Sequence, residues 1–189
     1  MTADRPEGTW SLSTRVIVYS AIGAALYAVF NWIAFAIQIP GTQEVSVRPH
    51  YGLLTFFGFA FGPVVGFLTG FVGNTVGDQL AYGDAFGSWW WSVANGLAGL
   101  VAGLFPALMV SRMASGGGRA VMAAIAGVVG TILGFLFIWI ELIIQPELGF
   151  NTILTTEYIP VVIGNSIAAA IVTPILVLAW DPLREQLGR

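Results

Sequence analysis

The sequence contains no cysteine and no lysine, and His50 is its only histidine. Without lysine the chain has neither the lysine of a Walker A phosphate-binding loop nor one that could form a Schiff base. Without cysteine, and with one histidine, it cannot supply a multi-histidine metal site or a zinc motif, and it has no G-x-S-x-G nucleophile elbow. We therefore expect no P-loop ATP hydrolysis, no metal, no cofactor and no enzymatic activity.

Charged residues are also scarce. They form 9% of the chain, whereas hydrophobic residues form 57%; a typical soluble domain is about a quarter charged. The segment from Val16 to Ile37 carries no charge and exceeds the ~20 residues that a helix needs to cross the hydrocarbon core. It is too long for a signal-peptide core, so we interpret it as a retained span. The sequence thus predicts an all-α integral membrane protein, embedded in the lipid bilayer and without a nucleic-acid partner.

Apolar runs between glycine, proline and polar breakers predict six transmembrane helices. They cover residues 15–37, 50–61, 63–81, 89–112, 119–144 and 158–180. Only Gly62 and Pro63 separate the second run from the third, so a single kinked helix over residues 50–81 is the alternative. At 1.5 Å per residue that helix would be about 48 Å long, well beyond a hydrocarbon core of about 30 Å.

The arginines favour six helices over five. With six, one side of the membrane receives Arg5, Arg15, Arg112, Arg119, Arg184 and Arg189. Only Arg48 then lies on the other side. Short basic loops stay in the cytoplasm, so both termini are expected there. The predicted organisation is a cytoplasmic tail at 1–14, one six-helix membrane domain at 15–180 and a second cytoplasmic tail at 181–189.

Polar side chains of the predicted helices concentrate at the outer level of the membrane, whereas the inner halves are almost purely apolar. Polar groups are costly in lipid and usually face a cavity or a partner, so we expect a shared outer pocket. Asn74 and Asp78 are spaced i, i+4 and so share one helix face. The candidate ligand-binding residues are Asn31, Trp32, Arg48, His50, Tyr51, Asn74, Asp78, Trp90, Asn95, Glu141 and Asn165.

Several of these residues have a structural alternative. Tryptophans 89–91 could form an interfacial aromatic belt, and at most one or two of them can face a pocket because they point in different directions on a helix. Arg48 could pair with Asp78 or Glu141. His50 could be a loop residue without a role, and the asparagines could form hydrogen bonds between helices.

Small residues form two further patterns. The GxxxG spacings at Gly66/Gly70 and Gly73/Gly77 indicate close packing between helices. The first helix carries rows of alanine at Ala21, Ala24, Ala25 and Ala28, which could face either an internal neighbour or an external membrane partner.

Four sequence segments resemble the substrate-binding S components of energy-coupling-factor (ECF) transporters, the prokaryotic micronutrient importers. They are Asn31-Trp32, Arg48-Pro49, Trp89 through Trp91, and the FGPVxGFxxGxxGxxxxD pattern from Phe61 through Asp78. The long pattern is fairly specific and the resemblance covers about the whole chain.

The resemblance implies a six-helix, non-catalytic S component in a prokaryotic cell membrane. Its outward pocket would hold a vitamin-sized ligand under a loop formed by Gln38 to Val47. A membrane-embedded T subunit and two cytoplasmic ATPases would complete the importer. The family's AxxxA motif for docking onto the T subunit matches Ala21/Ala25 or Ala24/Ala28.

Two other classes remain open. A self-sufficient secondary transporter or channel would need a polar path through the inner half, and an intramembrane enzyme would need a carboxylate pair such as Asp78 and Glu141. The ligand is also open. Aromatic residues suit a flat ring, Arg48 with His50 could hold a carboxylate or phosphate, and the acidic residues suit a cationic group. Riboflavin, thiamine or its pyrimidine precursor, and a tetrapyrrole all fit these features.

Overall fold

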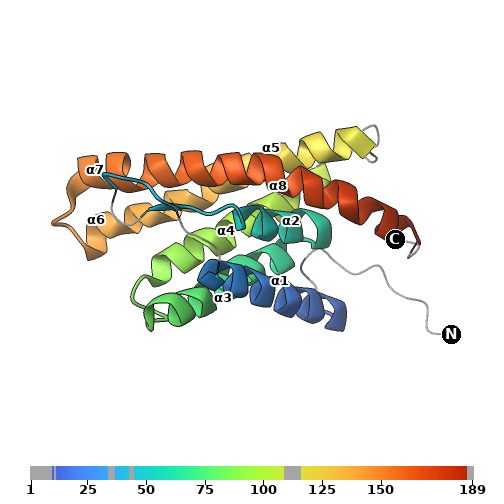
Figure 1. Ribbon diagram of the computed structural model, residues 1–189, viewed down its shortest axis with the longest axis horizontal. Helices are drawn as coiled ribbons and strands as arrows, with labels where there is room; N and C mark the ends of the chain where they lie inside the picture. Colours follow the sequence, from blue (N-terminus) through green and yellow to red (C-terminus); the bar gives the residue numbers. More distant parts are fainter. Residues whose placement is uncertain (1–9, 11, 34–36, 43–44, 109–115, 187–189) are drawn as a thin grey trace.

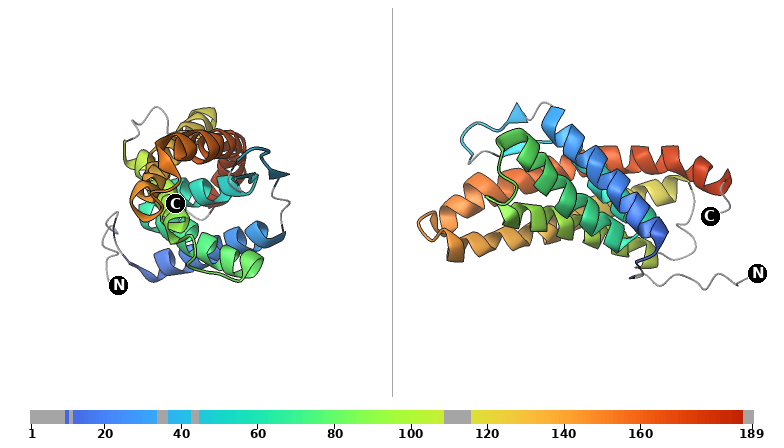
Figure 2. Two further views of the ribbon diagram at one scale, coloured as in Figure 1. Left: turned by 90° about the vertical axis from the view of Figure 1, so that its left-hand side faces the viewer. Right: turned by 90° about the horizontal axis from the view of Figure 1, so that it is seen from below.

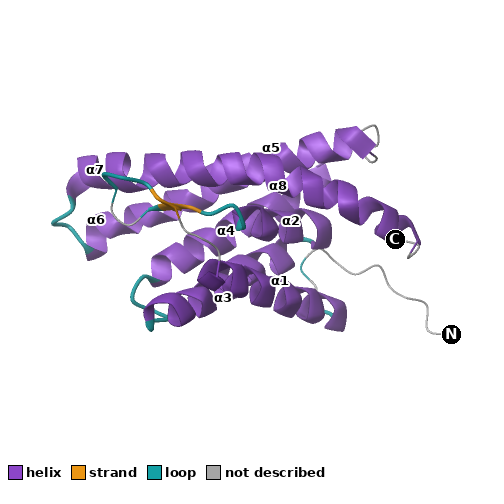
Figure 3. Cartoon of the chain, in the orientation of Figure 1, coloured by secondary structure: helices purple, strands orange, loops and turns teal. Residues whose placement is uncertain are grey.

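Helices form nearly all of the regular structure (Figures 1 and 3). The computed structural model describes the chain except for residues 1–9, 11, 34–36, 43–44, 109–115 and 187–189. The helices are α1 (Thr14–Ile33), α2 (Tyr51–Phe61), α3 (Pro63–Tyr82), α4 (Trp89–Leu108), α5 (Gly116–Gly134), α6 (Glu141–Ile144), α7 (Gly149–Thr152) and α8 (Ile159–Gln186). The 3-10 helix η2 (Phe135–Ile140) joins α5 to α6, and the π-helical segment η3 (Ile153–Tyr158) joins α7 to α8.

A short β-hairpin lies within the predicted loop between the first two helices. Strands β1 (Ile37–Gln38) and β2 (Ser46–Val47) pair antiparallel, with Ile37 opposite Val47. The Ile39 amide donates to the Val45 carbonyl over 2.8 Å, which continues the ladder by one bond. In the described part of the chain this hairpin is the one departure from the predicted all-α structure.

The membrane-spanning potential is uneven among the helices. Three stretches of the described chain are long and apolar enough to cross a membrane: Thr14–Ile33, Gly116–Ile144 and Gly149–Gln186. Tyr51–Phe61 is apolar but shorter. Helices α3 and α4 have 20 residues each, yet their polar and small residues keep them out of this set. Each of the six predicted runs therefore contains a helix, but the first run was drawn too long, because α1 ends at Ile33 and Ile37 belongs to β1. Residues 109–112 of the fourth run lie outside the described part.

The chain reverses direction at Gly62, so residues 50–81 do not form one kinked helix. Gly62 has φ 105°, a conformation that glycine adopts without a Cβ clash, and Pro63 begins α3. Beyond the turn, a Cβ added at Gly66 would overlap the Cα of Gly58, which shows that α3 runs back along α2. The reversal places the end of α3 at the level where α2 begins.

The two GxxxG pairs of α3 serve two different neighbours. A Cβ at Gly66 or Gly70 would overlap backbone atoms of α4, at Gly99 and Asn95 respectively. A Cβ at Gly73 would lie too close to the side chain of Tyr27 on α1. Glycine thus lets α3 approach a helix on each side, as the sequence predicts.

The bundle has an α1–α3 side and an α5–α8 side, with α4 and α2 between them (Figures 1 and 2). At the end where α1 and α5 begin and α8 ends, the core is aromatic and aliphatic. Its buried members are Phe56, Phe57, Phe59, Val65, Ala102, Ala123, Ala126 and Val177. The opposite end, which includes α6, α7 and the turn from α3 to α4, contains the cavity described below.

The C-terminal helix is longer than the predicted span of 158–180. The helical stretch begins at Gly149 and α8 continues to Gln186, so Asp181 lies inside a helix. There it forms a 3.0 Å salt bridge with Arg119 of α5. The predicted tail that starts at residue 181 is therefore helical through Gln186.

Candidate functional site

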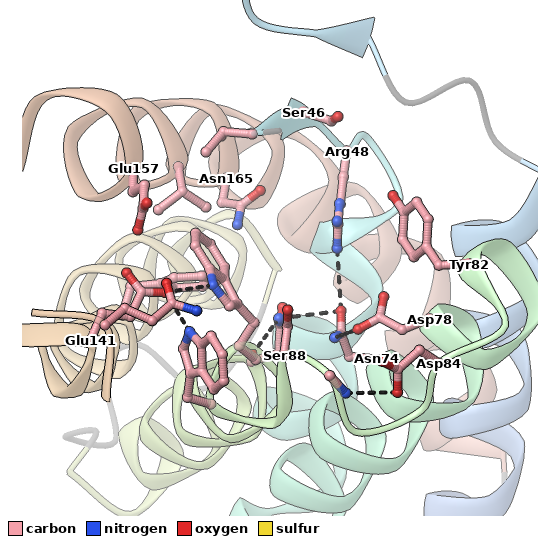
Figure 4. Close-up of a pocket in the computed structure, with 18 of the residues that line it drawn as sticks. Ser46, Arg48, Asn74, Asp78, Tyr82, Asp84, Ser88, Glu141, Glu157 and Asn165 are labelled. Atoms are coloured by element: carbon pink, nitrogen blue, oxygen red, sulfur yellow. Dashed lines mark hydrogen bonds between the residues drawn. The ribbon is translucent and has the colours of Figure 1, made fainter. Parts of the chain in front are cut away.

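A cavity of about 410 Å³ lies at the end of the bundle opposite the start of α1 (Figure 4). The hairpin, the turn before α2, and the elements α3, α4, η2, α6, η3 and α8 all contribute to it. Its lining residues are Val45, Ser46, Arg48, Asn74, Asp78, Tyr82, Asp84, Gly87, Ser88, Trp90, Trp91, Asn95, Phe135, Glu141, Gln145, Leu148, Glu157, Val161 and Asn165. The walls therefore combine aromatic rings, amides, four carboxyl groups and one guanidinium.

Asn74 is the centre of a hydrogen-bond network on one side of the cavity (Figure 4). Arg48 Nη1 donates to Asn74 Oδ1 over 3.2 Å, and Asn74 Nδ2 donates to Asp78 Oδ2 over 2.7 Å. Asn74 Nδ2 also donates to Ser92 Oγ over 3.1 Å, and Asn95 Nδ2 donates to Asn74 Oδ1 over 3.4 Å. The i, i+4 pair of α3 thus forms a direct contact and links the turn before α2 to α4.

Arg48 reaches Asp78 through Asn74. In the described part of the chain the guanidinium forms no salt bridge, so neither of the two proposed carboxylate partners holds it directly. Asp78 also accepts a hydrogen bond from Asn31 Nδ2 over 3.4 Å. The positive group of Arg48 and the negative group of Asp78 therefore line the same side of the cavity and are linked through side-chain amides.

Two tryptophans and Glu141 form a second cluster (Figure 4). The indole N–H groups of Trp90 and Trp91 both donate to Glu141 Oε1, the latter over 3.0 Å. Glu141 is 2% exposed, and Glu157 of η3, which is 4% exposed, lies close enough to interact with it directly. Asn165 of α8 completes this side of the cavity.

Most of the predicted site residues meet in this cavity. Arg48, Asn74, Asp78, Trp90, Asn95, Glu141 and Asn165 line it. Asn31 lies behind Asp78 and contacts it by the hydrogen bond described above. The seven lining residues come from five separate segments, and Asn31 adds a sixth. Residues so far apart in the sequence could be predicted to meet only from the expected membrane topology.

Three predicted residues lie elsewhere. Trp32 is 58% exposed on α1 and faces away from the bundle. His50 and Tyr51 turn into the core as α2 begins: the His50 ring lies 5.2 Å from the Tyr27 ring, and the Tyr51 hydroxyl accepts a 3.1 Å hydrogen bond from Thr131. Arg48, which precedes the helix, is the member of this segment that reaches the cavity.

Glu157 and Trp91 line the cavity although the sequence interpretation did not select them. Glu157 lies just outside the predicted last span, which begins at residue 158. Since the helical stretch begins at Gly149, Glu157, Val161 and Asn165 are spaced at four-residue intervals along one face, and all three line the cavity. That spacing was readable in the sequence. Val45 and Ser46, which also line the cavity, belong to the predicted covering loop from Gln38 to Val47. The lining residues outside the predicted set are Tyr82, Asp84, Gly87, Ser88, Phe135, Gln145, Leu148 and Val161.

The alanine rows of α1 separate into a buried and an exposed pair. Ala24 and Ala28 are 7% and 2% exposed, and the Ala24 carbonyl lies against Gly73 of α3. Ala21 and Ala25 are exposed. Of the four alanines predicted to dock a partner, Ala24 and Ala28 are therefore occupied by the packing of α1 on α3.

Apolar membrane-length helices around a polar, ligand-sized cavity define a membrane protein that binds a small molecule. The chain matches the family described as ECF-type riboflavin transporter, S component, over residues 11–181, and it belongs to that family. This confirms the resemblance drawn from the sequence. The family is one of transporter subunits and not of enzymes. No solved structure matches the chain.

Proposed function

We propose that this chain is the S subunit of an ECF-type importer. It captures a vitamin or related micronutrient in an outward-facing pocket and delivers it with a T subunit and two cytoplasmic ATPases. The observation that carries the proposal is the cavity itself, where buried polar side chains from separate helices converge at one end of the bundle. Family membership supports the subunit's role. The predicted site residues that line the cavity are its proposed ligand contacts.

The remainder of the bundle supports a binding subunit more than a self-sufficient carrier. Among the described residues, the core at the end opposite the cavity consists of phenylalanine and aliphatic side chains, and Arg119 and Asp181 at that end are paired with each other, so these residues offer no continuous polar lining to an ion or polar solute. A channel or proton-coupled carrier would need such a path. An intramembrane enzyme is also less well supported, because Asp78 and Glu141 belong to separate clusters on different sides of the cavity (Figure 4).

The orientation that we propose has six spans, with both termini in the cytoplasm of a prokaryotic cell. Arg15 near the start of α1, Arg119 near the start of α5 and Arg184 near the end of α8 lie at the end opposite the cavity (Figure 1). Arg48 lies at the cavity. The positive-inside rule then directs the cavity outward. The other three predicted cytoplasmic arginines, Arg5, Arg112 and Arg189, lie outside the described residues.

The hairpin is placed to act as the outer cover of the pocket. Val45 is 4% exposed and lines the cavity together with Ser46, so the loop contacts the site from outside the helices. Its turn is held by Thr42, whose hydroxyl donates to the Ile39 carbonyl over 2.6 Å. Of the predicted loop from Gln38 to Val47, residues 43–44 lie outside the described part.

Reconstitution tests the proposal. Proteoliposomes would contain either this chain alone or the chain with its T subunit and ATPases, and would be given ATP with radiolabelled riboflavin or thiamine. We expect ATP-dependent accumulation of a vitamin only with the full complex, and none when the ATPases carry a substitution of their Walker A lysine. Accumulation by the chain alone would contradict the proposal and favour a secondary carrier.

A further inference from the structure

One side of the cavity holds three buried oxygen atoms that meet no hydrogen-bond donor among the described residues. They are Glu141 Oε2, Glu157 Oε2 and Asn165 Oδ1. The three residues are 2%, 4% and 3% exposed, and all of them line the cavity (Figure 4). Because a buried acceptor without a donor is costly, and a buried carboxylate more so, this side of the cavity lacks a partner that it is built to hold.

The surrounding protein does not supply that partner. Both indole N–H groups of the tryptophan pair go to Glu141 Oε1 and leave Oε2 free of them. The salt bridges of the described chain join Arg119 and Arg184 to Asp181, at the far end of the bundle. Glu141 and Glu157 instead face each other within hydrogen-bonding range, so either a proton or a cationic donor is needed between the two carboxyl groups.

The opposite side of the cavity differs in this respect. There Asn74 uses both its oxygen and its amide nitrogen, and Asp78 accepts from two asparagines. Arg48 adds one positive charge beside the negative Asp78. The unmatched negative character of the cavity is therefore concentrated at Glu141 and Glu157.

We propose that the Glu141–Glu157 side of the cavity binds a positively charged, nitrogen-bearing group of the micronutrient, such as a protonated amine or an amino-substituted cationic heterocycle. Its N–H groups donate to Glu141 Oε2, Glu157 Oε2 and Asn165 Oδ1. The proposal rests on the proposed function, since it names the chemical class of the ligand in that same pocket.

The lining favours an organic cation over a metal ion. The described residues contain no group of three or more histidine, cysteine, aspartate or glutamate side chains that could hold a metal. Trp90 and Trp91 line the cavity beside Glu141, and indole rings attract organic cations while they offer no ligand to a hard metal. Riboflavin, whose name appears in the family description, carries no positive charge, so the proposal separates this pocket from a flavin site.

Three vitamins of different charge test the assignment: thiamine as the cation, riboflavin as the neutral ring and pantothenate as the anion. Binding to the purified full-length protein in detergent is measured by calorimetry, with quenching of tryptophan fluorescence as a second readout. We expect thiamine to bind at least about tenfold more tightly than the other two. Glu157→Gln should then weaken thiamine binding about tenfold or more, the loss expected when a charged hydrogen-bond partner is removed.

Glutamine is nearly isosteric with glutamate, which limits damage to the fold. Glu141→Gln provides a second variant, because its carbonyl oxygen can still accept from both indoles. The matched control is Glu147→Gln, which removes the same charge from an exposed residue of the loop between α6 and α7 and should leave thiamine affinity within about twofold. All variants must remain monodisperse.

The assignment is overturned if riboflavin or pantothenate binds more tightly than thiamine, if thiamine does not bind the monodisperse wild-type protein, or if Glu157→Gln and Glu141→Gln leave its affinity unchanged. These results differ from a failure of the proposed function. Tight riboflavin binding that depends on Asn74 but not on Glu157 would support the cavity as the ligand-binding site and contradict only the proposal of a cationic ligand. Uptake by the chain without a T subunit would contradict the proposed role as an S subunit, whichever ligand is transported.

Discussion

Asn74 is the residue on which the arrangement of the cavity depends most directly. Its oxygen accepts from Arg48 and Asn95, and its amide nitrogen donates to Asp78 and Ser92. The residue is 1% exposed, so these bonds are made away from bulk solvent. A single side chain thus positions groups from the turn before α2, from α3 and from α4. These four bonds use both acceptor sites of its oxygen and both N–H groups of its amide nitrogen.

Asn74→Ala should weaken binding of the natural ligand by at least about 1 kcal/mol, because the mutation removes a buried hydrogen-bond partner of several groups at once. Calorimetry with the ligand that co-purifies with the wild-type protein, identified by native mass spectrometry, measures the change. Asn151→Ala is the matched control, since Asn151 is exposed on α7 and does not line the cavity. Wild-type affinity in Asn74→Ala would show that this network is not part of the site.

At the residue scale the sequence predicts which residues line the cavity where helical spacing applies, and predicts this less well where the chain enters a helix. The contact between Asn74 and Asp78 follows from their i, i+4 spacing. His50 and Tyr51 were expected to line the cavity with Arg48, but their direction depends on the residue at which α2 begins. Glu157 lies one residue before the predicted span of 158–180, whereas the chain is helical from Gly149.

At the element scale, α3 depends on glycine for its two close neighbours. On the α4 side, backbone meets backbone: a Cβ at Gly66 would overlap the carbonyl of Gly99, and a Cβ at Gly99 would overlap the carbonyl of Gly66. Backbone atoms of packed helices cannot move aside as a flexible side chain can. Both helices also supply residues of the cavity, so their separation sets the position of Asn74 relative to Asn95.

Gly66→Ala should therefore lower the stability of the protein by about 1–3 kcal/mol, the usual cost of an overpacked core. A fall in the midpoint of thermal unfolding in detergent measures this. Gly117→Ala is the control, because a Cβ there meets nothing within 4 Å and alanine favours the helix. An unchanged midpoint in Gly66→Ala would mean that α3 and α4 can separate without cost.

The first helix offers a test of the docking surface. Ala25 is exposed on α1, whereas Ala28 on the same helix is buried against the bundle. Ala25→Trp should therefore leave folding and ligand binding intact but block docking onto the T subunit, because close helix approach needs small residues. Uptake by the reconstituted complex is the readout. Wild-type uptake by a stably folded Ala25→Trp protein would exclude this face as the docking surface.

Ala28→Trp completes that comparison. Its side chain would enter the packing of α1 on α3, so we expect lower thermal stability and loss of ligand binding as well as of uptake. The four alanines look alike in the sequence, because two AxxxA rows one turn apart give no sign of which faces the bundle. Only the position of α3 beside α1 separates them.

At the scale of the whole molecule, the alternation of apolar runs and breakers largely predicts where the helices lie along the chain. What remained out of reach arises from tertiary contacts. The 3-10 helix η2 and the π-helical η3 interrupt two long helices beside the cavity, where Glu141 and Glu157 turn inward. Local propensity does not encode such interruptions, since they serve contacts between distant segments. The short hairpin is likewise a tertiary feature, since β2 lies beside α8.

The charge asymmetry of the whole molecule yields a prediction about its orientation. The chain has no cysteine, so a single cysteine can be introduced at any exposed loop without background labelling. Glu147 lies between α6 and α7 at the cavity end, and Gly117 lies at the start of α5 at the opposite end (Figure 1). Because the described arginines other than Arg48 gather at the second end, the positive-inside rule places Gly117 in the cytoplasm and Glu147 outside.

A membrane-impermeant maleimide applied to intact cells should therefore label Glu147→Cys but label Gly117→Cys only after the membrane is opened. Both substitutions fall on exposed positions away from the cavity lining, so ligand binding should be retained and serves as the check on folding. Labelling of both cysteines from the same side would overturn the single span predicted between them and the rest of the topology. Labelling of Gly117→Cys alone would reverse the orientation, point the cavity to the cytoplasm and remove the basis for capture of a nutrient from outside.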